Sequence, residues 1–225
     1  PEILAELRGE SEIADIYLYR CVRIPFKDRY ILVIGGSFPI LAKYGGLWFR
    51  QGDTEAIMAT VSAGGRQPPG SGPWPAVISE PLAETFGYRE GDTFVLPTPA
   101  GPQTMQVDGV FYDYRTDGPS VWMDIRQFRG FWPDNQVNAV RLYLKDGVNL
   151  KEYQAELQAR YGGRYRLLTL SHADLRQGIL DIFDETFALT YALEGVAVIV
   201  AIFGIITTFL VVIMDREWEL ALLQA

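Results

Sequence analysis

The sequence predicts an α+β fold: a split β-α-β layer with an inserted small antiparallel β subdomain, followed by a long helix that becomes a transmembrane span. Two observations predict it. Most of the 225 residues alternate short apolar runs with turns rich in glycine and proline, which is typical of a mixed domain. The C-terminal part instead contains an uncharged apolar run that is long enough to cross a bilayer.

Residues 1–46 are expected to form the first half of the α+β subdomain. Pro1 suits the first turn of a helix that runs to about Arg8. Alternating side chains then predict strands at Ile16–Ile24 and Tyr30–Ile34. This half therefore reads as a β-α-β unit that lacks its first strand.

Residues 47–135 are expected to form the inserted β-rich subdomain. A flexible stretch rich in glycine and proline is predicted at Ser62–Pro75. The pattern after it predicts the strand Val77–Ile78, a helix capped by Ser79 and running through Phe86, and the strands Thr93–Leu96 and Thr104–Tyr114. In the last of these strands the apolar alternation changes phase at Gly109, which indicates a β-bulge.

Residues 136–190 are expected to form the second half of the α+β subdomain and a stalk helix. The pattern predicts a strand at Val137–Lys145, a helix from Leu150 to Tyr161 that ends at Gly162-Gly163, and a strand at Tyr165–Leu170. Ser171 and Asp174 then have the spacing of a capping box, so a further helix is predicted to begin there.

The stalk helix is predicted to continue into the membrane. Its apolar stripe consists of Leu175, Ile179, Ile182, Phe183 and Phe187. No proline lies between Ser171 and Met214, so we expect one long helix; the alternative is a kink at Gly195 that divides it in two.

Residues 191–214 are predicted to be the transmembrane helix. Val196–Met214 comprises 19 residues without a charge, and a helix of that length spans about 28 Å. Four small residues recur on one face: Ala197, Ala201, Gly204 and Thr208. Small residues let helices approach closely, so this face is expected to pack against other transmembrane helices. The alternative is chance spacing in a helix that only anchors the chain.

Charge and composition exclude several classes of function. The formal net charge is −8 and Lys and Arg do not cluster, so nucleic-acid binding is not expected. The single cysteine, Cys21, excludes an internal disulfide and is expected to be a small buried residue on a strand.

Catalytic and metal-binding patterns are not found in the sequence. The one histidine, His172, is expected at the start of a helix, without convergent partners. No P-loop occurs, and Asp113, Asp117 and Asp124 match no calcium loop. We therefore expect no catalytic residue, no metal and no cofactor in this chain.

Aromatic residues gather at Phe111–Tyr114 and Phe128–Trp132. They are expected to pack in the core and at the edge of the β subdomain; the alternative is a surface that grips an acyl chain or a partner protein.

Three runs of residues resemble the periplasmic core domain and following helix of FtsX-like or MacB-like ABC transporter permeases. They are VISEPLAETFGYREGDTFVL (Val77–Leu96), VDGVFYDYRTDG (Val107–Gly118) and REWELALLQA (Arg216–Ala225). The last run follows the family pattern R-x-x-E-[IL]-x-x-L-R-A except at Gln224, where the family usually has arginine. The resemblance implies that residues 215–225 begin a cytoplasmic coupling segment.

The resemblance also implies a function, a location and partners. The chain would be a fragment of a permease in the bacterial inner membrane, with residues 1 to about 190 outside the cytoplasm. A separate cytoplasmic ABC ATPase subunit would dock at Arg216, Glu219, Leu220 and Leu223. Its ATP hydrolysis would move the outer domain, to export or extract a lipoprotein, lipid, peptide or drug-like substrate. Other implied partners are the remaining transmembrane helices of the permease or of a second copy, and a periplasmic protein.

Three other readings stay open at the level of the sequence. The chain could be a transmembrane scaffold or regulator that activates an envelope cell-wall hydrolase, since that class shares this architecture. It could be a binding domain on a single-span anchor. The last reading is an enzyme whose site has no recognisable pattern.

Overall fold

The computed structural model describes residues 2–68, 72–113, 118–134, 136–163 and 172–223. The chain forms two compact units, Pro1–Val148, which we name the sheet unit, and Asn149–Ala225, which we name the helical unit.

The sheet unit is built on one mixed sheet of seven strands in the order β4-β5-β3-β6-β2-β1-β7. The strands are β1 Ile13–Phe26, β2 Arg29–Gly36, β3 Trp74–Ser79, β4 Thr93–Leu96, β5 Gln103–Phe111, β6 Ser120–Asp124 and β7 Ala139–Leu144. The pairs β2/β6 and β3/β5 are parallel, and the other neighbours are antiparallel. The predicted α+β class is confirmed.

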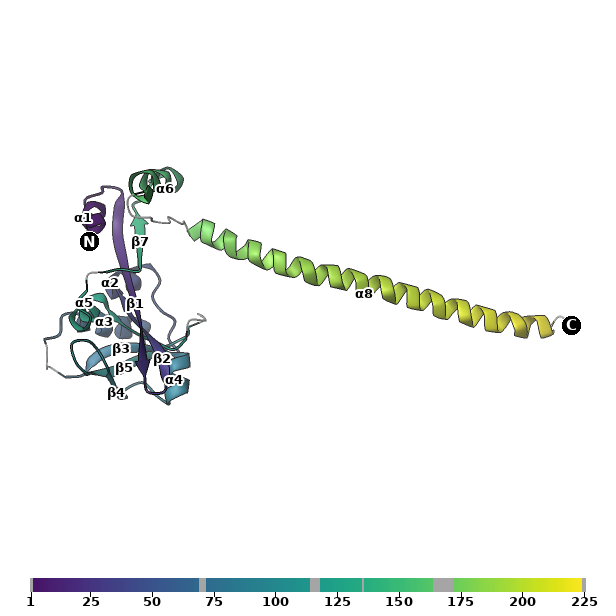
Figure 1. Cartoon of the computed structure of the whole chain (residues 1–225), viewed down its shortest axis with the longest axis horizontal. Coiled ribbons are helices and arrows are strands. Elements are labelled where there is room, and N and C mark those ends of the chain that lie inside the picture. Colours follow the sequence, from purple (N-terminus) through teal and green to yellow (C-terminus); the bar gives the residue numbers. More distant parts are fainter. Residues whose placement is uncertain (1, 69–71, 114–117, 135, 164–171, 224–225) are drawn as a thin grey trace. The chain divides into compact units, whose positions relative to one another are not determined.

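Helices cover both faces of this sheet. They are α1 Glu2–Arg8, α2 Phe38–Tyr44, α3 Thr54–Gly64, α4 Glu80–Phe86 and α5 Ile125–Phe131 (Figure 1). Side chains alternate along a strand, so Val33 and Met123 join one core with α4 and α5, while Ile34 and Trp122 join another core with α2 and α3. The sheet is therefore the middle of three layers.

The local predictions in this unit are largely confirmed. Helices lie at Glu2–Arg8 and Glu80–Phe86, and β4 has the predicted bounds. The bulge in β5 is also present, because Ala76 pairs with Val107 and Val77 pairs with Gly109, which leaves Asp108 as the extra residue.

One capping prediction is wrong. Ser79 precedes α4, but its hydroxyl makes no capping hydrogen bond. It accepts instead from the backbone N–H of Ser120, at 2.9 Å, in the buried space between β3 and β6. A buried N–H without a partner is costly, and the hydroxyl satisfies this one.

The sequence pattern did not reveal α2, α3, β6 or α5. The helix α3 extends to Gly64, so the first residues of the stretch that we expected to be flexible are helical. The strand β6 lies in the middle of the sheet and pairs with β2 in parallel. Strands from residues 47–135 thus share one sheet with those from residues 1–46, and a division of the chain at these points stays a prediction.

The helical unit contains α6 Leu150–Leu157, the π-helical turn η1 Gln158–Gly162 and α8 His172–Leu223. The predicted strand Tyr165–Leu170 and the cap at Ser171 lie outside the described residues. The helix α8 has 52 residues and passes through Gly195 without interruption. The prediction of one long helix is confirmed, and the alternative of two helices divided at Gly195 is wrong.

Candidate functional site

The most distinctive surface of the chain is the apolar middle of α8. Thr190–Met214 is the one helical segment among the described residues that is long and apolar enough to cross a membrane. Every side chain in it is exposed within the chain, including Phe203 and Phe209. An apolar surface of this extent is not stable in water, whereas 25 residues of helix, about 38 Å, exceed the hydrocarbon thickness of a bilayer.

The predicted packing face lies within this candidate span. Ala197, Ala201, Gly204 and Thr208 recur at helical spacing along α8 and are all exposed. The Thr208 hydroxyl donates to the backbone oxygen of Gly204 at 2.8 Å, so its polar group is satisfied inside the helix. The contact of this face with another transmembrane helix stays a prediction, because no second helix lies against it among the described residues.

The residues predicted to dock an ATPase lie at the C-terminal end of α8. This helix continues through Leu223, so Arg216, Glu219, Leu220 and Leu223 share one helical face. The side chain of Arg216 is exposed. The end of the coupling run, Gln224 and Ala225, lies outside the described residues.

A row of aromatic rings precedes and enters the candidate span. Phe183, Phe187 and Tyr191 are each four residues apart, and successive ring centres lie 6.3 and 6.4 Å apart. All three side chains are at least half exposed. The stripe predicted from the sequence contains Phe183 and Phe187 but not Tyr191, although the spacing of Tyr191 continues the row. Tyr191 stands near the start of the span, where amphipathic rings favour the membrane interface.

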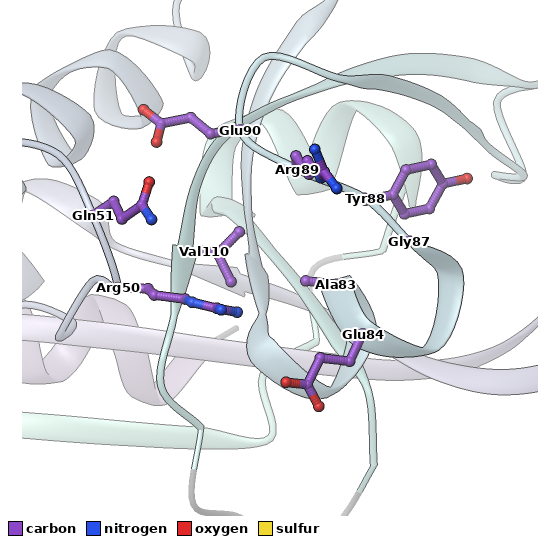
Figure 2. A pocket seen from close by; sticks show the side chains of 9 residues that line it. All are labelled: Arg50, Gln51, Ala83, Glu84, Gly87, Tyr88, Arg89, Glu90 and Val110. Carbon is purple, nitrogen blue, oxygen red and sulfur yellow. The ribbon is translucent and has the colours of Figure 1, made fainter.

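The sheet unit carries an open pocket of about 790 Å³ beside α4. Figure 2 shows Val110 and Ala83 at its centre, with Arg50, Glu84, Arg89 and Glu90 around them. Arg50 is 3.8 Å from Glu80, which holds it loosely in place. Charges of both signs surround an apolar floor, and none of the described lining residues forms a nucleophile–base pair. The pocket therefore presents charged and apolar groups side by side.

Two of the three acidic residues that we considered as metal ligands make structural contacts. Asp113 accepts a hydrogen bond from the Ser120 hydroxyl at 3.0 Å. Asp124 is buried, caps α5 and pairs with Arg126 at 2.7 Å; this hydrogen bond raises the pKa of the guanidinium. Asp117 lies outside the described residues. The described residues contain no group of three metal-ligating side chains.

Most of the described residues in the two aromatic clusters pack in the core, as expected, whereas Tyr114 lies outside the described residues. Phe111, Phe128, Phe131 and Trp132 are buried, and the rings of Phe128 and Trp132 stack at 4.8 Å. Tyr112 is partly exposed at the end of β5. Cys21 is half-buried on β1 and packs at the margin of the core that contains α2 and α3.

Ion pairs tie β1 to other parts of the sheet unit. Lys43 and Tyr44 of α2 both donate to Asp15, at 2.6 and 2.7 Å, and these hydrogen bonds lower the pKa of Asp15. Arg20 donates twice to Asp134, at 2.7 and 3.3 Å, which lowers the pKa of that carboxyl group. Both clusters are structural, because each side chain meets its counter-charge directly.

Comparison with known proteins gives two informative likenesses. No protein-family model matches the chain. Over 150 residues it is 33% identical to the uncharacterized ABC transporter permease protein Rv0987 of Mycobacterium tuberculosis, a match that covers 66% of this chain and 18% of the relative. The chain thus spans less than a fifth of that protein.

One solved structure shows the fold. The periplasmic region of MacB from Actinobacillus actinomycetemcomitans superposes with a TM-score of 0.50 at 13% identity, covering 78% of this chain and 79% of that one. The extracellular domain of the noncanonic ABC-type transporter YknZ from Gram-positive bacteria gives a TM-score of 0.44 at 12% identity, covering 72% and 83%. The resemblance predicted from the sequence is confirmed: this chain has the fold of the MacB periplasmic region, carries one candidate transmembrane helix within its described residues, and is similar in sequence to an ABC transporter permease.

Proposed function

We propose that this chain is part of the permease subunit of an ABC system, in which a separate cytoplasmic ATPase subunit moves an extracytoplasmic domain. The observation that carries the proposal is the continuity of α8, which runs without a break from His172, through the candidate span, to Leu223. In this arrangement residues 1 to about 190 lie outside the bacterial plasma membrane, and residues 215–225 begin the cytoplasmic coupling segment.

The mechanism is mechanical transmission through a stiff helix. An unbroken helix keeps its backbone hydrogen bonds within itself, so a displacement of one end is carried to the other. The helix rises about 1.5 Å per residue, so 52 residues extend about 78 Å, more than twice the hydrocarbon thickness. ATP hydrolysis at the cytoplasmic end would thereby reposition the outer domain and export or extract a lipoprotein, lipid, peptide or drug-like substrate.

Two different faces of α8 contact two different kinds of partner. The packing face of Ala197, Ala201, Gly204 and Thr208 lies against other transmembrane helices of the same permease or of a second copy. The face of Arg216, Glu219, Leu220 and Leu223 docks the ATPase subunit. The permease name of the M. tuberculosis relative supports the two kinds of partner, and the assignment of each face rests on the residue spacing along α8.

A test of transmission inserts seven residues after Asp184, outside the candidate span, in the full-length protein. Seven residues make nearly two whole turns, so a helical insert of Ala, Glu and Lys keeps both ends in rotational phase. A Gly/Ser insert of equal length interrupts the continuous helix. We expect the Gly/Ser insert to abolish substrate-dependent stimulation of the ATPase and the helical insert to retain it. Equal stimulation with both inserts would contradict mechanical transmission.

A test of docking uses two leucines on opposite sides of the helix end. Leu220 and Leu222 are two residues apart, about 200° around the helix. We expect Leu220→Glu to prevent co-elution of the ATPase subunit with the full-length permease, and Leu222→Glu to leave it intact. Truncation before Asp215 should have the effect of Leu220→Glu. Unchanged co-elution after truncation would place the contact elsewhere.

A further inference from the structure

A lysine at the tip of the β1–β2 hairpin lies against three aromatic rings. The Nζ atom of Lys27 is 5.7 Å from the ring centre of Phe26, 5.0 Å from that of Phe86 and 4.8 Å from that of Tyr88. Phe26 ends β1, Phe86 ends α4, and Tyr88 follows the glycine that caps α4. All three distances fall within the range in which a cation is attracted by an aromatic ring.

The rings are held in place from behind by the core. Phe26 is buried and meets Phe86 and Phe94 edge to face, with ring centres 5.2 and 5.9 Å apart. Tyr88 lies 5.2 Å from Phe94. These contacts do not involve Lys27, so they would still support the rings if the lysine side chain moved away. Tyr88 also lines the pocket of Figure 2. Phe86 and Tyr88 are half-buried and Lys27 is exposed, so this group of rings lies at the surface.

Lys27 itself is held in an unfavourable backbone conformation. Among the residues that the structure describes, it is the one non-glycine residue with a positive φ, +53°. That region costs a side-chain-bearing residue free energy. The structure records no carboxylate pairing with its ammonium group in the described chain; the neighbouring Asp28 instead lies 3.9 Å from Arg29. The side chain of Lys27 is exposed, so its ammonium group meets solvent on one side and the three rings on the other.

We propose that Phe26, Phe86 and Tyr88 form an aromatic cage for the organic ammonium group of an external ligand, and that Lys27 occupies the cage as an internal competitor. Quaternary and primary ammonium groups are bound by convergent ring faces, and the ammonium of Lys27 stands where such a group would lie. The ligand class is a choline-type or other alkylammonium compound, either free or as a lipid headgroup. Binding requires the lysine side chain to leave, which lowers the apparent affinity of the native chain.

The decisive variant is Lys27→Gly in the full chain, solubilised in a maltoside detergent. Glycine accepts the positive φ and removes the competing ammonium, so the fold is retained while the cage is emptied. Choline chloride is titrated by calorimetry against a sodium chloride blank. We expect choline to bind Lys27→Gly roughly tenfold more tightly than it binds the native chain. Arg29→Gly, in the same hairpin, should bind as the native chain does.

Substitutions of a cage residue test whether choline binds to the rings or whether the Lys27→Gly substitution increases choline binding in some other way. In the Lys27→Gly background, Tyr88→Phe keeps the ring and should retain choline binding, whereas Tyr88→Leu should abolish it. Unchanged denaturation midpoints would show that each variant is folded. The proposal is overturned if Lys27→Gly shows no saturable choline binding, or if Tyr88→Leu binds as well as Tyr88→Phe.

The source of the ammonium group is distinguished with lipid nanodiscs. Lys27→Gly is reconstituted in phosphatidylcholine or in phosphatidylglycerol discs, and choline is titrated into each. A loss of choline binding only in phosphatidylcholine indicates that the lipid headgroup fills the cage. Equal binding in both discs indicates a free ligand. Either result supports an ammonium site, which does not depend on the transport function proposed above.

Discussion

Gly35 of β2 lies directly against Phe128 of α5. A Cβ atom on Gly35 would be 2.6 Å from the Cβ of Phe128, closer than atoms of this kind approach in proteins. Phe128 is fully buried in the core that contains α4 and α5. Because Gly35 has no side chain, α5 can lie this close to the sheet.

We expect Gly35→Ala to destabilise the sheet unit by about 1–3 kcal/mol, because an added methyl group forces either β2 or α5 to move. Gly130→Ala is the matched control: it lies on α5 with nothing within 4 Å of an added Cβ, so it should be neutral or slightly stabilising. Urea denaturation of the full chain in detergent, followed by tryptophan fluorescence, measures both. Equal stability of the two variants would show that α5 is not held at this distance.

The packing face can be tested with two glycines of the same helix. Gly195 and Gly204 are nine residues apart and therefore point to opposite sides of α8. Both substitutions to leucine add the same bulk and the same helix propensity. We expect Gly204→Leu to weaken association between transmembrane helices and Gly195→Leu to leave it unchanged, measured by energy transfer between labelled permeases in vesicles. Weakening by both variants would argue against a specific face.

A charge in the middle of the candidate span should oppose insertion. Ile202 lies at the midpoint of Thr190–Met214, and Lys at the centre of a transmembrane helix costs about 2.5–3.5 kcal/mol. We expect Ile202→Lys to reduce membrane-integrated protein strongly, measured as the fraction resistant to alkaline extraction. Thr190→Lys, at the end of the span, should insert normally because the lysine side chain reaches the interface. Normal insertion of Ile202→Lys would contradict a membrane span here.

The pair Arg20–Asp134 predicts a dependence of stability on pH. Hydrogen bonds from Arg20 lower the pKa of Asp134 below the ordinary aspartate value of 3.8. A folded-state pKa below the unfolded value stabilises the fold above the unfolded pKa, and this contribution is lost as pH falls through the folded pKa. We expect Asp134→Asn to cost about 1 kcal/mol at about pH 7 and progressively less below pH 3.8.

Denaturation midpoints across that pH range measure the effect of the pair. Asp28→Asn is the control, since Asp28 is largely exposed and 3.9 Å from Arg29, and it should be neutral at every pH. A cost of Asp134→Asn that does not change with pH would show that the carboxylate acts through packing and not through its charge.

Several features of the fold follow from local sequence patterns because their causes are local. The alternation of Thr93–Leu96 and the turn at Gly91-Asp92 predict β4, which is formed as expected. The change of phase at Gly109 predicts a bulge, and the paired strands place the extra residue one position earlier, at Asp108. In each case the signal lies within a few residues of the feature.

The central strand β6 shows why other features could not be predicted. Ser120–Asp124 is short, and all five residues are buried, so no alternation of exposed and buried side chains marks it as a strand. Its partners β2 and β3 are distant in the chain. The hydroxyl of Ser79 was misjudged for the same reason, since its partner, the N–H of Ser120, reaches it only when β3 and β6 come together.

The sequence by itself determined the long apolar helix, because its uncharged length and the absence of proline are properties of consecutive residues, and they suffice for a continuous helix through Gly195. Only the tertiary structure decided the order of the seven strands, the three-layer arrangement around them and the position of Lys27 against three rings. These features depend on hydrogen bonds and buried contacts between residues far apart in the chain. Such contacts do not produce a periodic pattern in the sequence.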